Sequence, residues 1–148
     1  PENINARGGM LIGSCLAGVA FTKGLGLVHS ISHMIGAEYN TQHGLTNAII
    51  LPVVMKFNLP HVGEKVRFIS HAMDLKDASS DLITEEIEKI LNYVDIPRSL
   101  SEIGIPLECK KRIAKKAMLD SATGTNPRVA KIEDIEELTE ISILSARK

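Results

Sequence analysis

Apolar residues recur along this chain at the three- to four-residue spacing of helices, and no segment shows the convincing alternation of a strand. The clearest case begins at residues 79–81, where serine and aspartate oxygens can accept backbone N–H bonds at a helix start. The apolar stripe that follows consists of Ile83, Ile87, Ile90 and Leu91. The whole pattern predicts helices near residues 4–22, 25–36, 43–58, 61–72, 79–94, 107–121 and 132–146. We therefore expect one all-α, bundle-like domain over residues 1–148.

Glycine and proline positions predict where these helices end or bend. Gly36 is expected to stop the second helix, because glycine readily adopts the left-handed conformation that ends helices. A short polar loop over residues 38–42 should follow. Pro52 is expected to kink or break the third helix, since proline lacks a backbone N–H and clashes with the preceding turn. Residues 96–106 contain two prolines and a glycine, so we expect a connector there.

Composition limits the classes of protein that fit. Hydrophobic residues make up 44% of the 148 positions, with no tryptophan, which suits a core of packed helices. The formal net charge of -1 gives no electrostatic footprint for nucleic acid, so we expect no nucleic-acid partner. The basic cluster within residues 110–116 has helical spacing and is expected to be a solvated face.

The cysteines and the N-terminal apolar run point to a cytoplasmic protein. Cys15 and Cys109 are far apart and form no Cys-x-x-Cys pattern, so neither a disulfide framework nor a zinc knuckle is indicated. Residues 8–22 carry no charge, yet this run is shorter than the roughly 20 apolar residues that span a bilayer. Its Gly, Ser and Cys content favours a buried helix. We expect no membrane association.

Three histidines lie within one glycine-punctuated segment, residues 24–44. His29 and His33 are four residues apart and therefore share a helix face, and His43 begins the next apolar run, from which it could return to that face. Imidazole is a common ligand of zinc, iron, copper and nickel. A metal site and a set of ordinary hydrogen-bonded histidines are both compatible with this pattern. The glutamate of a zinc-protease helix is absent, because Ser30 follows His29.

A series of short motifs runs through residues 16–58: Leu16-Ala-Gly-Val-Ala-Phe21, Gly24-Leu-Gly-Leu-Val-His29, Ser32-His33, Tyr39-Asn40, His43-Gly44, Asn47-Ala48-Ile49, Leu51-Pro52 and Phe57-Asn58. Together they resemble the signature of the iron-containing alcohol dehydrogenase family. Further on, residues 125–128 and 132–135 are similar to the family's C-terminal turn and last helix. The resemblance implies the all-helical C-terminal domain of a two-domain protein, and we expect residues 1–148 to be a fragment without the N-terminal nucleotide-binding domain.

The resemblance also implies roles for individual residues. His29 and His43 correspond to two of four metal ligands, while the remaining aspartate and histidine would lie upstream of Pro1. His33 resembles the extra histidine beside the metal and is our candidate for proton transfer or substrate orientation. Phe21 resembles a residue near the nicotinamide. Tyr39 and Asn40 could line the substrate pocket or be ordinary loop residues.

The implied activity is the reversible oxidation of an alcohol to an aldehyde or ketone with NAD or NADP. Fe²⁺ is the metal that the family name implies, while Zn²⁺, Mn²⁺ and Ni²⁺ remain open. The expected partners are a small alcohol or carbonyl substrate and, through exposed apolar surface, a second copy of the chain. The alternative hypothesis is a non-catalytic helical domain that binds metal or mediates assembly.

Overall fold

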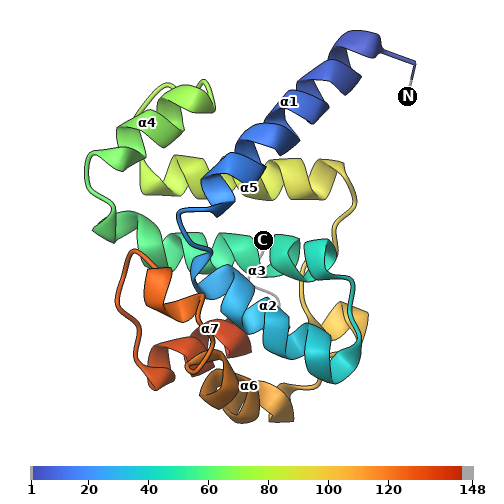
Figure 1. The fold of residues 1–148 in the computed structure, drawn as a ribbon, viewed down its shortest axis with the longest axis vertical. Coiled ribbons are helices and arrows are strands. Elements are labelled where there is room, and N and C mark those ends of the chain that lie inside the picture. The colour runs from blue at the N-terminus through green and yellow to red at the C-terminus, as the bar shows by residue number, and fades with distance from the viewer. Residues whose placement is uncertain (1, 145–148) are drawn as a thin grey trace.

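The computed structural model describes residues 2–144, which form helices and no strands, so the predicted all-α fold is confirmed (Figure 1). The α-helices are α1 (Ile4–Phe21), α2 (Gly26–Tyr39), α3 (His43–Asn58), α4 (Lys65–Ala72), α5 (Ser80–Tyr93), α6 (Lys110–Ala117) and α7 (Ile132–Leu144). Short 3₁₀ turns lie at Leu59–His61, Ser101–Ile103, Leu107–Cys109 and Thr123–Thr125.

The core lies where α2 packs against α3, α6 and α7 (Figure 1). On α2, the i, i+4, i+8 positions Leu27, Ile31 and Ile35 are fully buried. Ile50 of α3 and Ile113 of α6 are equally inaccessible and belong to the same cluster. Burying each such side chain contributes about 1.5–3 kcal/mol. This packing gives α2, which carries two of the three histidines, a fixed face toward the core.

The C-terminal half of α2 is also tied to α6 by ion pairs. The Glu38 carboxylate accepts from Arg112 Nε at 2.9 Å and from Lys116 Nζ at 2.6 Å. Lys110, at the start of α6, pairs with Glu140 of α7 at 2.6 Å. The basic face predicted over residues 110–116 is therefore partly paired with acidic groups of α2 and α7.

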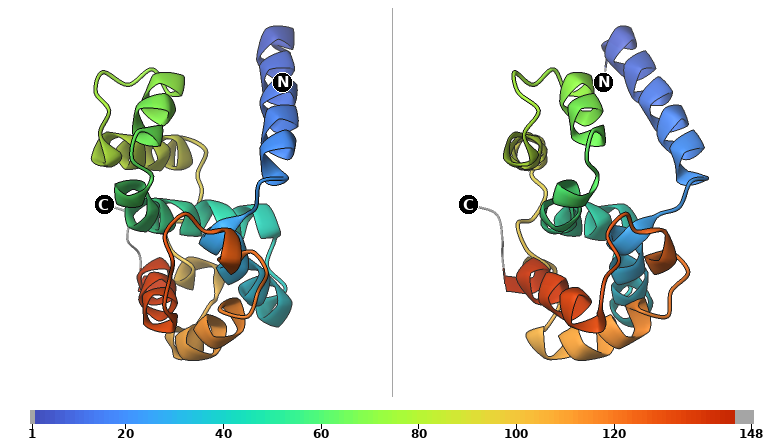
Figure 2. Two further views of the ribbon diagram at one scale, coloured as in Figure 1. Left: turned by 60° about the vertical axis from the view of Figure 1, so that its left-hand side comes forward. Right: turned by 90° about the vertical axis from the view of Figure 1, so that its left-hand side faces the viewer.

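Helix α1 differs from the prediction. It stands clear of the other helices in both views of Figure 2, and none of its residues is buried. The prediction that this helix is buried is therefore wrong for the described residues, because the core is formed mainly by α2, α3, α6 and α7 and includes no residue of α1. By length and composition, α1 is also able to cross a membrane, with mean hydropathy 1.3 over 18 residues. Core helices of soluble proteins pass the same test.

Helix α2 does not stop at Gly36. It continues to Tyr39, and Asn40 ends it in the left-handed conformation with φ 54° and ψ 39°, donating its N–H to the Gly36 carbonyl. Asparagine is the other residue that adopts this conformation readily. Tyr39 therefore lies on the helix rather than in a loop, and the connection to α3 is only residues 40–42. Helix α3 is continuous through Pro52, so of the expected kink or break, the break does not occur.

Other helices are confirmed with shorter bounds. α5 starts after Ser79, whose hydroxyl accepts from the Leu82 N–H as predicted. Of its expected apolar stripe, Ile83 and Leu91 are buried, but Ile90 is exposed. α4 begins at Lys65 and α6 ends at Ala117, each a few residues inside the predicted range. The last predicted residues, 145 and 146, lie outside the described part of the chain.

Candidate functional site

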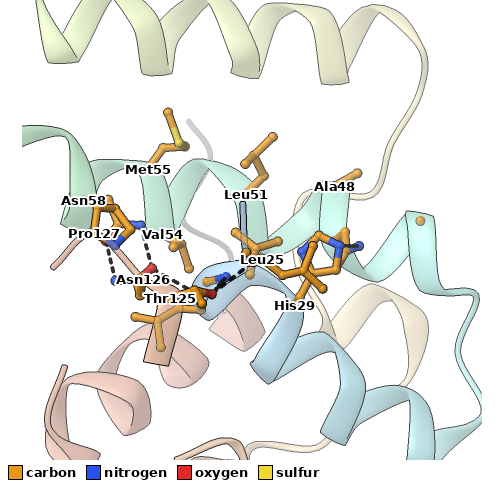
Figure 3. Close-up of a pocket in the computed structure, with 16 residues that line it drawn as sticks. Leu25, His29, Ala48, Leu51, Val54, Met55, Asn58, Thr125, Asn126 and Pro127 are labelled. Carbon is orange, nitrogen blue, oxygen red and sulfur yellow. Dashed lines mark hydrogen bonds between the residues drawn. The ribbon is translucent and has the colours of Figure 1, made fainter. Parts of the chain in front are cut away.

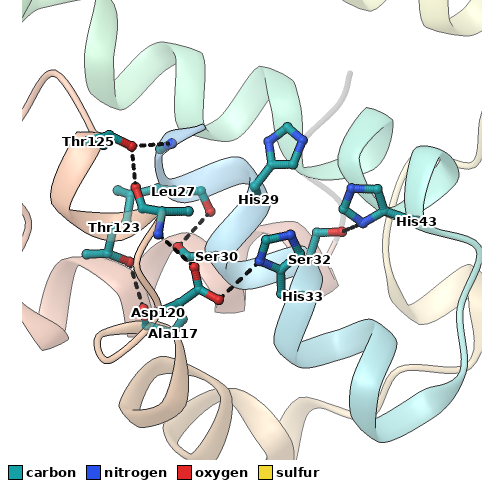
Figure 4. A network of polar contacts seen from close by, with 12 residues as sticks. Leu27, His29, Ser30, Ser32, His33, His43, Ala117, Asp120, Thr123 and Thr125 are labelled. Carbon is teal, nitrogen blue, oxygen red and sulfur yellow. Dashed lines mark hydrogen bonds and ion pairs between the residues drawn. The ribbon is translucent and has the colours of Figure 1, made fainter. Parts of the chain in front are cut away.

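The three histidines predicted as a group come together at one surface of α2 and α3 (Figure 4). The ring centroids are 5.8 Å apart for His29 and His33, 5.2 Å for His29 and His43, and 5.4 Å for His33 and His43. The helical spacing of four places His29 above His33, and the tight Asn40 turn returns the chain so that His43 begins α3 beside them. The local sequence of residues 29–43 thus brings the three rings to the same place.

Asn47, one turn after His43 on α3, shows where two of the ring nitrogens point. Its amide Nδ2 lies 3.3 Å from His29 Nε2 and 3.0 Å from His43 Nε2. A single small group can approach both nitrogens only if their lone pairs converge. Asn47 Oδ1 is buried and has no hydrogen-bond partner among the described residues. The Nε2 atoms of His29 and His43 therefore converge on one point, where they could serve as metal ligands.

The opposite ring nitrogens have different environments. His43 Nδ1 lies 3.2 Å from the Ser32 hydroxyl, and His33 Nδ1 lies 3.1 Å from Asp120 Oδ2 (Figure 4). A ligating histidine is commonly held by such a contact at its second nitrogen. His29 Nδ1 is buried without a hydrogen bond of normal geometry within residues 2–144.

The electrostatics of the cluster favour a neutral His29. Burial lowers its pKa below the ordinary 6.5, and the adjoining His43 and His33 lower it further. The Leu25 backbone and the Asp120 carboxylate act in the opposite direction, but they do not offset the burial. Neutral imidazole is the form that binds metal.

A distant turn fixes the N-terminal end of α2 and hence the position of His29. The N–H groups of Leu25 and Gly26 lie 3.1 and 3.3 Å from Thr125 Oγ1, and the Leu27 N–H donates to Asn126 Oδ1 at 3.1 Å. These donors are among those that a helix start leaves without intrahelical partners. The bonds are drawn in Figure 3. The Thr125–Asn126 turn therefore caps the histidine helix from 99 to 100 residues away in sequence.

Close approach at this cap requires glycine. Gly24 has φ +110°, and a Cβ there would lie 2.3 Å from Thr125 Cβ. Gly26 has φ +70°, and its Cβ would lie 2.9 Å from Asn126 Oδ1. Both conformations are strained for other residues. The two glycines thus allow the Thr125–Asn126 turn to reach the helix backbone.

The same turn is anchored to α3. Asn58 Nδ2 donates to Asn126 Oδ1 at 3.0 Å, and Asn126 Nδ2 donates back to Asn58 Oδ1 at 2.8 Å. The Arg128 guanidinium stacks 3.7 Å from the centre of the Phe57 ring. Through these contacts, residues 125–128 join the start of α2 to the end of α3.

A mainly apolar cavity of about 510 Å³ adjoins the cluster (Figure 3). In Figure 3, His29 lies at one end of it, and Asn58 and Asn126 lie at the other. Asn47, which contacts His29, also lines it. Its apolar wall consists of Leu25, Leu27, Val28, Ala48, Leu51, Val54 and Met55. The cavity places a large uncharged space directly beside the converging nitrogens.

Phe21, the predicted cofactor-side residue, lies at the end of α1 with its ring edge-on to His29, 6.0 Å between centroids. Tyr39 turns away from the histidines toward α6, where its hydroxyl accepts from Arg112 at 3.1 Å. His61 and His71 belong to the segments around α4 and are not among the site contacts described above. The structure therefore gathers Phe21, His29, His33 and His43 and separates Tyr39 from them.

Comparison with known proteins identifies the family. The model of the Fe-containing alcohol dehydrogenase family, C-terminal region, matches residues 1–143. The chain belongs to this family. Lactaldehyde reductase of Escherichia coli K12 is 40% identical over 136 residues, covering 87% of this chain and 36% of that protein. The NAD-dependent methanol dehydrogenase of Bacillus methanolicus is 38% identical, covering 93% and 38% of the two chains.

Solved structures agree with this assignment. An alcohol dehydrogenase from Oenococcus oeni superimposes with a TM-score of 0.80 at 30% identity, over 86% of this chain and 35% of that one. A 1,3-propanediol oxidoreductase superimposes with a TM-score of 0.75 at 28% identity, over 80% and 33%. The chain thus spans about a third of the length of these relatives and corresponds to the helical C-terminal domain of iron-containing alcohol dehydrogenases.

The donor set of this chain fits part of a metal site. Within residues 2–144, no three His, Cys, Asp or Glu side chains are grouped so that they could hold a metal ion. His29 and His43 nevertheless offer two convergent ring nitrogens, and His43 has a polar contact at its second nitrogen. Two such nitrogens suit a divalent transition metal whose remaining ligands come from elsewhere.

Sequence reasoning did not find Ser32, Asn47 or Asp120. Ser32 and Asn47 stand in the matching family pieces, so the resemblance offered a signal that they matter. Asp120 contacts His33 across 87 residues of sequence. Its neighbours in the sequence do not distinguish it from the aspartates and glutamates that are expected on the surface.

Proposed function

We propose that the intact protein that contains this chain is an NAD(P)-dependent alcohol dehydrogenase, and that this domain supplies half of its metal site. The observation that carries the proposal is the convergence of His29 Nε2 and His43 Nε2 on the Asn47 amide. Family membership supports the reaction class, and the nearby Phe21 and apolar cavity supply surfaces for uncharged groups.

His29 and His43 would hold the metal, which we propose to be Fe²⁺. A divalent cation between them would supply Lewis-acid polarisation of an alcohol or carbonyl oxygen. The Asn47 amide, which lies against both nitrogens here, would have to release them. The lowered pKa of His29 favours this role, because a protonated imidazole cannot ligate a metal.

His33 would transfer or guide the proton of the substrate hydroxyl. Its ring lies beside both proposed ligands but bonds through Nδ1 to Asp120. Imidazole is suited to proton transfer because its ordinary pKa lies near neutrality. Phe21, edge-on to His29, would present an apolar face to the nicotinamide.

The rest of the intact protein would supply the nucleotide site, together with the metal ligands that residues 2–144 do not contain as a group. We propose that an upstream domain contributes the remaining metal ligands and the nucleotide site, and that α1 packs against it. The relatives are about three times as long as the matched region, since that region is 36% of the lactaldehyde reductase and 38% of the methanol dehydrogenase. Packing against protein would cover the apolar face of α1, so no lipid is required.

The proposal is tested by assaying the intact protein with Fe²⁺ and a panel of small alcohols, following reduction of NAD⁺ or NADP⁺ by absorbance. Small diols and primary alcohols are the first substrates to try, because the relatives named above act on lactaldehyde, methanol and propanediol. Alcohol-dependent reduction that is lost on chelation is the expected result. Stoichiometric metal with no reduction of either nucleotide across the panel would instead favour a non-catalytic metal-binding domain.

A further inference from the structure

We propose that Asp120 is a positioning residue for His33: it fixes the imidazole ring and selects the tautomer that carries its proton on Nδ1. The inference rests on the proposed function insofar as His33 serves the dehydrogenase reaction. It goes beyond that function by assigning a partner to His33 from a different part of the chain. The pair is drawn in Figure 4, where the Asp120 side chain reaches from the segment after α6 to His33 on α2.

The two carboxylate oxygens of Asp120 have separate partners. Oδ2 lies 3.1 Å from His33 Nδ1, and Oδ1 accepts the backbone N–H of Ala122 at 2.8 Å. The Thr123 N–H also donates to the Asp120 carbonyl at 3.1 Å. The Asp120 side chain is only 14% exposed, compared with 36% for His33. The turn therefore fixes the carboxylate, and the carboxylate in turn fixes the more exposed ring.

The chemistry of a carboxylate dictates the tautomer of a neutral His33. An ionised aspartate only accepts hydrogen bonds, so the ring nitrogen that faces it must carry the proton. With Nδ1–H directed at Asp120, the lone pair lies on Nε2. Carboxylate–histidine pairs of this kind set ring orientation and tautomer in both metal sites and acid–base sites.

The orientation of the His33 ring matters because the ring contacts both proposed metal ligands. His33 stacks on His43 with 16° between the ring planes, and it lies edge-on to His29. Any rotation of the His33 ring would therefore change its contacts with both proposed ligands. Asp120 prevents this rotation from outside the cluster, and it touches neither His29 nor His43 in any hydrogen bond described above.

Replacing Asp120 by asparagine separates this role from a structural one. In Asp120→Asn, the amide oxygen can keep the Ala122 bond, while the NH₂ group takes the place of the oxygen that faces His33. A donor there requires an unprotonated Nδ1 and so inverts the tautomer. The matched control is Asp134→Asn, because Asp134 Oδ2 likewise accepts a backbone N–H, that of Lys131 at 2.7 Å, and is distant from the histidines in sequence and contacts.

The experiment is ¹⁵N NMR of the histidine side chains in the metal-free intact protein, well above the ordinary imidazole pKa of about 6.5. The His33 signals are assigned by their loss in His33→Gln. We expect Nδ1–H in the wild type and in Asp134→Asn, and Nε2–H in Asp120→Asn. A wild-type His33 in the Nε2–H form, or the same tautomer with and without the Asp120 carboxylate, would overturn the proposal.

Kinetics of the same three proteins give a second readout. We expect kcat of Asp120→Asn to fall about 10- to 100-fold, with unchanged metal content and with Asp134→Asn at wild-type rate. Wild-type kcat in Asp120→Asn would overturn the catalytic part of the inference. An intact wild-type protein without alcohol-dependent activity would count against the proposed function, and the NMR comparison would still decide whether Asp120 sets the tautomer.

Discussion

Helices α1 and α2 are both rich in apolar residues, yet they differ completely in environment. Ile31 on α2 is fully buried, whereas Leu16 on α1 is 64% exposed. The side-chain hydrogen bonds of α1 are local, from Asn3 at its start and Thr22 at its end. By contrast, α2 is tied at one end to Thr125 and Asn126 and at the other to α6.

Apolar composition therefore predicts that a helix packs against another surface, but it does not identify that surface. α2 finds its partners within the described chain, and the histidines it carries are consequently placed with defined neighbours. No residue of α1 is buried within residues 2–144, and we propose that other surface of the intact protein covers it. The contact of Phe21 with His29 is therefore the only ring contact that links α1 to the site among those described.

A substitution in the core formed by α2 should destabilise the protein most. Ile31→Ala should lower the free energy of unfolding of the intact protein by about 3 kcal/mol, because it removes a fully buried side chain and leaves a cavity. Urea denaturation of the intact protein measures this. A loss below about 1 kcal/mol would mean that α2 is packed less firmly than its burial indicates.

Gly24→Ala tests the cap at the start of α2. The added Cβ would collide with Thr125 and the residue would keep a positive φ, so we expect a loss of about 2 kcal/mol in stability and reduced metal binding. Gly124→Ala is the control, because it lies beside Thr125 with open space around it and no positive φ. Equal effects of the two substitutions would contradict the role given to the Thr125–Asn126 turn.

Leu16→Ala tests whether α1 is covered in the intact protein. If α1 packs against an upstream domain, as we propose, this substitution should cost about 1–2 kcal/mol, measured by the same denaturation experiment. If Leu16 is as exposed in the intact protein as it is here, the cost should be close to zero. The second result would remove the proposed contrast between a self-contained α2 and a partner-dependent α1.

Glu38→Gln should have the smallest effect, about 0.5–1 kcal/mol, through the ion pairs with Arg112 and Lys116. Hydrogen bonds from these two residues lower the pKa of the Glu38 carboxyl below its ordinary 4.5. Its stabilisation is therefore fully present above pH 4.5 and is lost as the pH falls through the folded-state pKa. The difference between wild type and variant should shrink on acidification. The exposed pair Glu64–Arg67 supplies the control, Glu64→Gln, with little effect at any pH.

Most of the fold could be predicted because the apolar spacing and the end signals of a helix lie within its own sequence. The seven predicted helices exist, and Ser79 caps α5 as its side chain suggested. The errors arise where two local rules compete or where packing decides. Gly36 and Asn40 can both end a helix, and the chain uses Asn40. Pro52 costs α3 one backbone donor, yet Pro52 is buried and its helix continues, so packing outweighs the local preference.

The candidate site was predictable only in its local part. His29 and His33 share a face by spacing, and a three-residue turn brings His43 beside them. The partners that hold His33 and the start of α2 come from residues 120–126, 87 to 100 positions away in sequence. A single sequence contains no periodicity that pairs Asp120 with His33, so this contact had to come from the structure.

The most direct test of the account compares metal content and kcat in the intact protein for His29→Ala, His43→Ala and His33→Ala. The two proposed ligands should lose most of the bound metal when replaced, because each supplies one of the convergent nitrogens. His33→Ala should keep its metal and slow turnover about 100-fold or more, as expected for a lost proton-transfer group. Metal lost from His33→Ala but retained in His29→Ala or His43→Ala would contradict the assignment of ligands.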